Sequence, residues 1–143
     1  MSTETNKAIA RREVEAFESQ GNLSIADEVL APDYQLHFPG FPALDREGHK
    51  QMIAAFHAAF PDMRITLEAQ VAEGERVANH IVMEGTHQGP FQGIPATGKQ
   101  VTVRGMNLMR LAGSQIAELW GYLDTLGLMQ QLGAIPAPAP AGL

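Results

Sequence analysis

The chain of 143 residues contains no cysteine, which excludes disulfides, thiol nucleophiles and cysteine-ligated metals. It is also short of positive charge: its net charge is −6, and it has no basic run that would neutralise phosphates. No apolar run approaches the roughly 20 residues that a membrane helix needs, and residues 1–6 are polar, unlike a signal peptide. We therefore expect a cytoplasmic protein without nucleic-acid or membrane partners.

Several catalytic and cofactor motifs are missing as well. There is no His-x-His or His-Glu-x-x-His pair and no clustered carboxylate triad, so we predict no metal site. None of the serines stands in a nucleophile elbow, and the glycines of residues 89–98 lack the spacing of a phosphate-binding loop. A redox cofactor has no visible binding motif, and we expect the protein to work without a cofactor.

What the chain does contain is helical periodicity in its first 60 residues and strand-like alternation after them. The predicted elements, in chain order, are helices at 7–20 and 24–30, a strand at 34–38, a helix capped by Asp45 and ending near Phe60, strands at 63–72, 76–87, 99–111 and 115–123, and a short last helix ending at Leu132. Helices followed by consecutive antiparallel strands predict one α+β domain over residues 1–133, with helices on one face of a curved sheet. Residues 134–143 form a Pro/Ala-rich tail that we expect to be mobile.

The most informative stretch is the last predicted strand. Its odd-numbered residues, 117 to 123, are all apolar or small and can pack, whereas its even-numbered residues, 116 to 124, include two acids and two aromatics. A strand face that mixes aromatics with carboxylates is typical of a pocket wall. That face ends at Asp124, where the spacing becomes helical, and we predict that Asp124 is the working group of a small-molecule site.

A series of short motifs extends over almost the whole chain, from about residue 7 to residue 133. They are Phe60-Pro61-Asp62-Met63, Glu73-Gly74-Glu75-Arg76-Val77, Gly85-Thr86-His87, Gly93-Ile94-Pro95-Ala96-Thr97-Gly98, Glu118-Leu119-Trp120 with Asp124, and Leu128-Met129-Gln130-Gln131-Leu132-Gly133. In this order they resemble the SnoaL-like polyketide cyclase (ester cyclase) family of the NTF2-like superfamily.

The resemblance implies an NTF2-like (cystatin-like) cone, in which a curved mixed or antiparallel sheet and N-terminal helices enclose a hydrophobic pocket. It also implies a function, since the cyclases of this family use one Asp as general acid/base in an intramolecular aldol ring closure, without metal or cofactor. That Asp falls on Asp124 here, and the substrate would be a poly-carbonyl or aromatic small molecule. A homo-oligomer, either a dimer or a tetramer, is expected, with Leu119 and Leu123 as apolar surface on the outer face of the sheet.

Asp124 has a second interpretation, because it stands where an N-cap for the last helix belongs. A buried carboxyl that faces a cavity and is free of helix amides would favour catalysis. A carboxyl used up in capping would favour a non-catalytic binding protein on the same fold. A hydrolase or isomerase that has kept only the pocket is the third interpretation.

Three further candidates come from the last two strands. Trp120 shares the strand face of Asp124 and either faces a polycyclic substrate or belongs to the core. Arg104 would orient Asp124 or bind a substrate oxygen if its face is concave. Met106, on the same face as Arg104, occupies the place of a second Asp in the related limonene-epoxide hydrolases, which counts against epoxide hydrolysis.

The remaining candidates are histidines and a tyrosine. His37 precedes a Pro/Gly turn and is expected at the pocket mouth, and His80, in mid-strand, is either structural or a proton partner. Tyr122 is a conceivable oxyanion donor, as in ketosteroid-isomerase-type sites. His49 and His57 fall on the third helix and are expected to be solvated.

Overall fold

The computed structural model describes residues 2–136, so most of the expected tail lies outside the described part. The elements in chain order are α1 (Thr3–Arg12), the π-helix η1 (Glu13–Ser19), α2 (Ile25–Val29), β1 (Leu30–His37), α3 (Arg46–Ala59), β2 (Arg64–Glu73), β3 (Arg76–Thr86), β4 (Gln100–Ala112), β5 (Gln115–Leu123) and α4 (Thr125–Leu132). None of the helices within residues 2–136 is long and apolar enough to cross a membrane.

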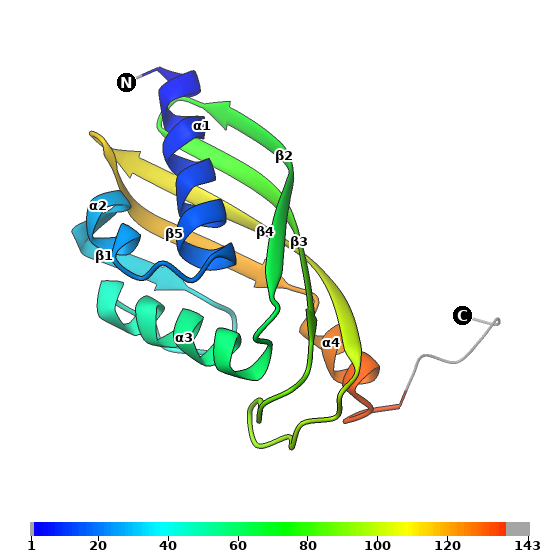
Figure 1. Ribbon diagram of the computed structural model, residues 1–143. Coiled ribbons are helices and arrows are strands. Elements are labelled where there is room, and N and C mark those ends of the chain that lie inside the picture. Colours follow the sequence, from blue (N-terminus) through cyan, green and yellow to red (C-terminus); the bar gives the residue numbers. More distant parts are fainter. Residues whose placement is uncertain (1, 137–143) are drawn as a thin grey trace.

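The five strands form one mixed sheet in the order β1-β5-β4-β3-β2, and it does not close into a barrel. Strand β1 runs parallel to β5, while the other neighbours are antiparallel. Helices α1 and α3 lie across one face of this curved sheet, and α4 follows the end of β5 (Figure 1). The prediction of an α+β fold with helices on one face of a curved sheet is therefore confirmed.

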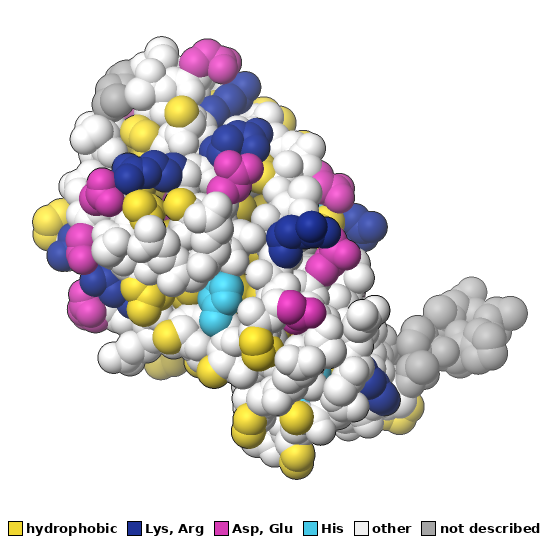
Figure 2. All heavy atoms as spheres, viewed as in Figure 1, with side chains coloured by type: hydrophobic (Ala, Val, Ile, Leu, Met, Phe, Trp, Pro, Cys, Tyr) yellow, Lys and Arg dark blue, Asp and Glu magenta, His cyan; other side chains and the backbone are white. Residues whose placement is uncertain are grey.

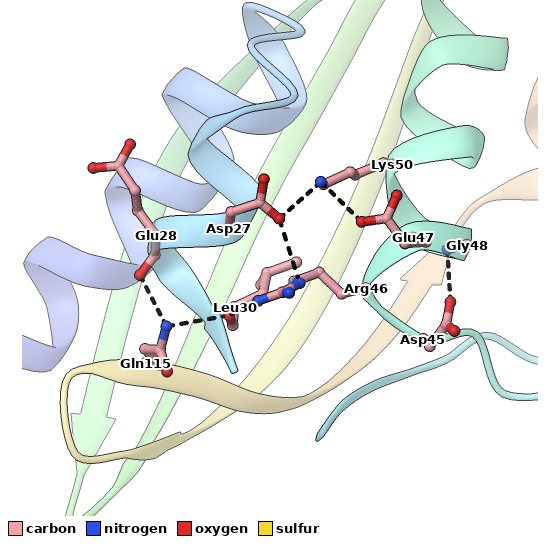
Figure 3. Close-up of polar contacts among 9 residues, drawn as sticks. All are labelled: Asp27, Glu28, Leu30, Asp45, Arg46, Glu47, Gly48, Lys50 and Gln115. Atoms are coloured by element: carbon pink, nitrogen blue, oxygen red, sulfur yellow. Dashed lines mark hydrogen bonds and ion pairs between the residues drawn. The ribbon is translucent and has the colours of Figure 1, made fainter. Parts of the chain in front are cut away.

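Capping and ion pairs fix the position of α3. The Oδ1 atom of Asp45 accepts a hydrogen bond of 2.7 Å from the amide of Gly48, which confirms the predicted N-cap. In the first turns of α3, Lys50 Nζ lies 2.8 Å from Asp27 Oδ1 in the middle of α2, and Arg46 Nε lies 3.4 Å from the same oxygen (Figure 3). These contacts hold the N-terminal half of α3 against α2, so that its buried side faces the sheet.

The alternation of β5 decides which of its side chains face the helices. Leu119 is 3% exposed and pairs with Met109, which is completely buried, so both point to the helix-covered face. Leu123 also packs against the core. The expectation that these two leucines form an apolar outer surface is wrong, because successive side chains of a strand point to opposite faces and the odd-numbered set takes the inner one.

The molecular surface on the helix-covered side, which Figure 2 shows, is of mixed character. Lys and Arg side chains are interspersed there with Asp and Glu, and hydrophobic side chains lie between them. This face therefore carries no continuous basic surface.

The loop after β3 packs tightly on the end of α3. The amides of Gln88 and Gly89 both donate to the carbonyl oxygen of Ala59, at 2.9 and 3.1 Å. A Cβ atom on Gly89 would collide with the backbone carbonyl of Ala58, which cannot move without displacing the helix.

We predict that Gly89→Ala lowers the free energy of unfolding by about 1–3 kcal/mol, as overpacking typically does. Gly121→Ala is the matched control, because its Cβ would meet the ring edge of Phe38 at 3.1 Å, where a flexible side chain can give way. Urea unfolding of both variants measures the difference. Equal losses in the two would show that the loop does not pack on α3 as described.

Candidate functional site

A mostly apolar cavity lies on the inner side of the sheet, between the sheet and α3. Its volume is about 50 Å³, and its apolar wall includes Phe38, Met52, Phe56, Ile81 and Met83. Besides these, the polar side chains of Glu18, His49, Asn107 and Tyr122 border it. The cavity is therefore a small hydrophobic space with a carboxyl group and an imidazole in its wall.

The π-helix η1 brings two glutamates to the same place. Residues five apart on an α-helix point about 140° away from each other, whereas a π-helix bonds residue i to i+5. Here the amide of Gln20 donates to the carbonyl oxygen of Glu15, five residues earlier, at 3.1 Å. The wider turn lets Glu13 and Glu18 turn toward the same interior point, and π-helical turns occur frequently at functional sites.

Glu13 is completely buried, and as a carboxylate it has no hydrogen-bond partner for either oxygen. Burial raises the pKa of Glu13 well above its usual value, and the adjacent charge and hydrogen bond of Glu18 raise this pKa further. Burial also raises the pKa of Glu18, while a hydrogen bond with Glu13 opposes that rise. Two ionised carboxylates cannot hydrogen-bond to each other, so a hydrogen bond between Glu13 and Glu18 requires a proton on one of them.

His49 joins Glu18 to a buried tyrosine. Its Nδ1 atom lies 2.9 Å from the hydroxyl of Tyr34, and its Nε2 atom lies 3.7 Å from Oε2 of Glu18. Burial lowers the pKa of His49 to about 3, and burial raises that of Tyr34, so the ring is neutral and the phenol keeps its proton. With the phenol donating to Nδ1, the ring proton stays on Nε2 and faces Glu18.

A row of amides crosses the inner face of the sheet and ends at the cavity. Gln70 donates to Oδ1 of Asn79 at 3.0 Å, and Asn79 donates to Oδ1 of Asn107 at 2.7 Å. Asn79 and Asn107 are direct partners across β3 and β4. Because the oxygen of Asn107 is used as acceptor, its NH₂ group is the part left to donate toward the cavity.

Glu13, Glu18 and His49 also have the chemistry of metal ligands. One side-chain ligand atom from each lies within 4.8 Å of the others, and within residues 2–136 they are the one group of this kind. Carboxylate oxygen and neutral imidazole nitrogen suit a divalent cation such as Zn²⁺. The search for short sequence motifs could not find this group, because its members lie on η1 and α3.

The structure gives Asp124 a capping position at the end of β5. Its carboxylate is exposed, and Oδ1 accepts a hydrogen bond of 2.9 Å from the amide of Gly127, in the first turn of α4. The predicted cap is thus present.

Four of the other candidates lie beside Asp124. Together they border an open hollow of about 420 Å³, lined among others by His80, Arg104, Met106, Tyr122 and Asp124. Tyr122 is 57% exposed and Met106 50% exposed, and both also border the edge of the inner cavity. The structure thus brings these five candidates together around an open hollow in which most of them are exposed, and not in the buried pocket that the sequence analysis expected.

Trp120 and His37 form a separate cluster. Their rings stack with centroids 5.5 Å apart, and Nε2 of His37 lies 2.6 Å from Oε2 of Glu118. The guanidinium carbon of Arg76 lies 5.7 Å from the centre of the Trp120 ring, within range of a cation–π contact. Neither Trp120 nor His37 borders the inner cavity.

Sequence reasoning missed the buried ionisable groups. His49 was expected to be solvated, but it is 1% exposed, because it lies on the side of α3 that faces Tyr34 and Phe17. Glu13 falls in the helix predicted at residues 7–20, and that prediction did not mark it as buried. The available signal was its position beside Val14 and three residues after Ala10, both of which belong to the core.

A second hollow, of about 450 Å³, opens next to the cavity. Its lining combines the turn after β1 with α4 and includes Phe38, Phe41, Leu126, Met129 and Ile135. Phe38 borders both the hollow and the cavity, and so do Tyr122 and Leu123. We call this hollow the mouth, since Phe38 stands between it and the cavity.

The raised pKa of Glu13 predicts an unusual dependence of stability on pH. In the unfolded chain Glu13 releases its proton near the ordinary pKa of 4.5, whereas in the folded protein Glu13 keeps it to a higher pH. The free energy of unfolding therefore falls as the pH rises through the pKa of Glu13 in the folded state. Glu13→Gln has no proton to lose. We expect its stability to equal that of the wild type near pH 4 and to exceed it at pH 8, by about 1.4 kcal/mol for each unit by which the pKa is raised.

Urea unfolding of both proteins across this pH range tests the expectation. The opposite effect of His49, whose pKa is lowered to about 3 so that stability falls as pH drops below 6.5, is common to both proteins and cancels in the difference. Parallel stability curves would contradict a raised pKa at Glu13.

Comparison with known proteins agrees with this architecture. The sequence profile of the SnoaL-like polyketide cyclase family matches residues 8–132. The chain is 29% identical to the aklanonic acid methyl ester cyclase DauD of Streptomyces sp. (strain C5), over 94% of this chain and 84% of that protein. It is 27% identical to the nogalonic acid methyl ester cyclase of Streptomyces nogalater, over 84% and 91%.

Solved structures show the same fold. IdmH of Streptomyces antibioticus, a proposed polyketide cyclase, is 32% identical with a TM-score of 0.80, covering 90% of this chain and 98% of its own. AclR of Streptomyces galilaeus, a proposed hydroxylase, is 25% identical with a TM-score of 0.86, covering 96% and 87%. The profile match over nearly the whole described chain decides the family: the protein belongs to the SnoaL-like polyketide cyclase family.

Proposed function

We propose that this protein is a cyclase that closes a carbon ring in a poly-carbonyl substrate by general acid/base catalysis, without a cofactor. The observation that carries the proposal is the apolar cavity with Glu18 and neutral His49 in its wall. A carboxyl group in such surroundings is a stronger base than one in water, and carbon acids flanked by carbonyls need such a base. The methyl ester cyclases that the chain resembles give the substrate class.

The size of the cavity constrains how such a substrate binds. Pockets for small molecules usually measure roughly 300–1,000 Å³, so a cavity of about 50 Å³ holds only the reacting end of a multi-ring compound. The mouth, with about 450 Å³ and exposed Phe41 and Leu126, offers apolar area for the remainder. In this arrangement Phe38 moves aside and the mouth and cavity join.

The reaction needs two proton transfers and one new bond. A base removes a proton from the carbon between two carbonyl groups, the resulting enolate attacks a ketone of the same molecule, and the new alkoxide takes the proton back. Substrate and product are isomers, so the reaction needs no second reactant. The NH₂ group of Asn107 would stabilise the negative oxygen of the enolate, since its own oxygen is already occupied by Asn79.

Asp124 remains a candidate for the base, as the family resemblance implies. It lies close to Tyr122 and Leu123, at the outer edge of the cavity. Its exposure and its bond to Gly127 instead favour a capping role. By the criterion set out above, this geometry also favours the second candidate function, a non-catalytic binding protein. The expected homodimer or tetramer stays a prediction.

Two substitutions at Asp124 separate the cap from the base. Asparagine caps helices as well as aspartate does but cannot accept a proton, and alanine does neither. We expect Asp124→Asn to keep both stability and turnover, and Asp124→Ala to lose about 1 kcal/mol of stability.

Turnover is measured with aklanonic acid methyl ester and nogalonic acid methyl ester, by chromatography and mass spectrometry of an isomer of unchanged mass. Ring closure by the wild type supports the proposal. If both compounds bind to the wild type and neither is converted, the protein is a binding protein. If Asp124→Asn is stable but inactive, Asp124 is the base.

A further inference from the structure

We infer that Glu13 and Glu18 hold one proton between them, and that this makes Glu18 the carboxylate base in the cavity wall and Glu13 the protonated residue that positions it. This inference rests on the proposed function and names the group that carries it out. It assigns the proton transfer to residues of η1, on the helical side of the cavity, and away from the end of β5.

The geometry is the first support. The π-helical turn brings residues 13 and 18 together, and Glu13, Glu18 and His49 each contribute one atom to a group whose members lie within 4.8 Å of one another. Glu13 is completely buried and, when ionised, has no hydrogen-bond donor for either oxygen. A proton shared with Glu18 gives it a partner.

The charge balance is the second support. Tyr34 on β1 and His49 on α3 face the pair, and both are neutral. The ring of His57, also on α3, contacts the backbone carbonyl oxygen of Glu18, with its Nε2 atom 2.8 Å away. Within residues 2–136 no Lys or Arg forms an ion pair with either glutamate. If both glutamates were ionised, two buried negative charges would lie side by side without a compensating positive charge. One shared proton removes one of these charges, as in carboxylate dyads.

The surroundings decide which glutamate carries the charge. Glu18 borders the cavity and its side chain is 12% exposed, whereas Glu13 is completely buried and does not border the cavity. The Nε2 atom of His49 lies 3.7 Å from Oε2 of Glu18, and when it carries the ring proton it favours a negative charge there. Burial and the neighbouring charge both raise the pKa of Glu13, in agreement with a protonated Glu13.

The pair matches the demands of the ring closure. The Glu18 carboxylate takes the proton from the substrate carbon and becomes a neutral acid, so that the pair then holds two protons. Glu18 returns its proton to the new alkoxide, and the pair is restored. Because the pair and its neighbours never carry more than one negative charge, neither step buries an uncompensated second charge.

The same three side chains would also suit a divalent cation, which would neutralise both glutamates in place of the proton. The test has to separate these two arrangements. Metal analysis of the purified protein does so at once, since the inference expects less than stoichiometric Zn²⁺, Mn²⁺ or Fe and no change in thermal midpoint with EDTA.

Carbon-detected NMR of the wild type with ¹³C-labelled glutamate measures the carboxyl titrations directly. We expect Glu18 to titrate first and Glu13 to lose its proton only at a higher pH. Glu13→Gln retains a hydrogen-bond donor to Glu18 and should leave the Glu18 titration in place. Glu13→Met, of similar size but without a donor, should move it up by about one pH unit, since the lost bond favoured the charged form.

Activity gives the second readout, once ring closure has been observed. Glu18→Gln should lower turnover at least 100-fold, the typical contribution of a general base, and remain folded. Glu13→Gln should leave the dependence of turnover on pH unchanged. Glu13→Met should shift the acidic limb of that pH profile to higher pH, by the same amount as the Glu18 titration.

Two results would overturn the inference: both glutamates titrating near their ordinary value of 4.5, or a bound metal ion in stoichiometric amount. The NMR and metal measurements need no substrate, so they decide the shared proton even if the protein closes no ring. Conversely, ring closure that survives Glu18→Gln would leave the proposed function intact and remove Glu18 from it. If Glu13→Met does not fold, the wild-type and Glu13→Gln titrations still decide.

Discussion

The burial of two carboxyl groups in one hydrophobic interior is the constraint around which this site is built. An uncompensated charge in such surroundings costs several kcal/mol, and two adjacent ones cost more. Glu13 and Glu18 can meet there only because η1 departs from α-helical spacing. A helix that gave up its regular hydrogen bonds only to bury two acids would be a poor structural element, so a functional reason for the π turn is the simpler account.

The sheet separates two groups of polar residues. On its inner side the amides of Gln70, Asn79 and Asn107 lead to the cavity. On the other side Glu118 holds His37 and Arg110, beneath the stacked Trp120 ring. The outer group is held together by its own ion pairs and stacking, which explains its residues without a ligand. The inner group leaves the NH₂ group of Asn107 and the carboxylate of Glu18 free to act on one.

Much of the fold could be predicted from the sequence, because it follows from local patterns. Alternation identified the four long strands, Asp45 was identified as a cap from its position, and Asp124 was recognised as a possible cap before α4. The site was harder to predict. The alternation of odd- and even-numbered residues separates the two faces of β5 but does not say which face lies against the helices. In the structure, the apolar odd-numbered residues lie on that inner face. The pairing of Glu13 with Glu18 depends on a π-helix, which no periodicity of 3.6 residues reveals.

The most direct test of this account is a crystal structure of the protein with a poly-carbonyl substrate analogue that cannot cyclise. The account predicts that the analogue occupies the mouth and the enlarged cavity, with its acidic carbon against the Glu18 carboxylate and a carbonyl oxygen within hydrogen-bond distance of the Asn107 NH₂ group. An analogue bound instead in the open hollow beside Asp124, His80 and Arg104, with the cavity closed, would contradict it.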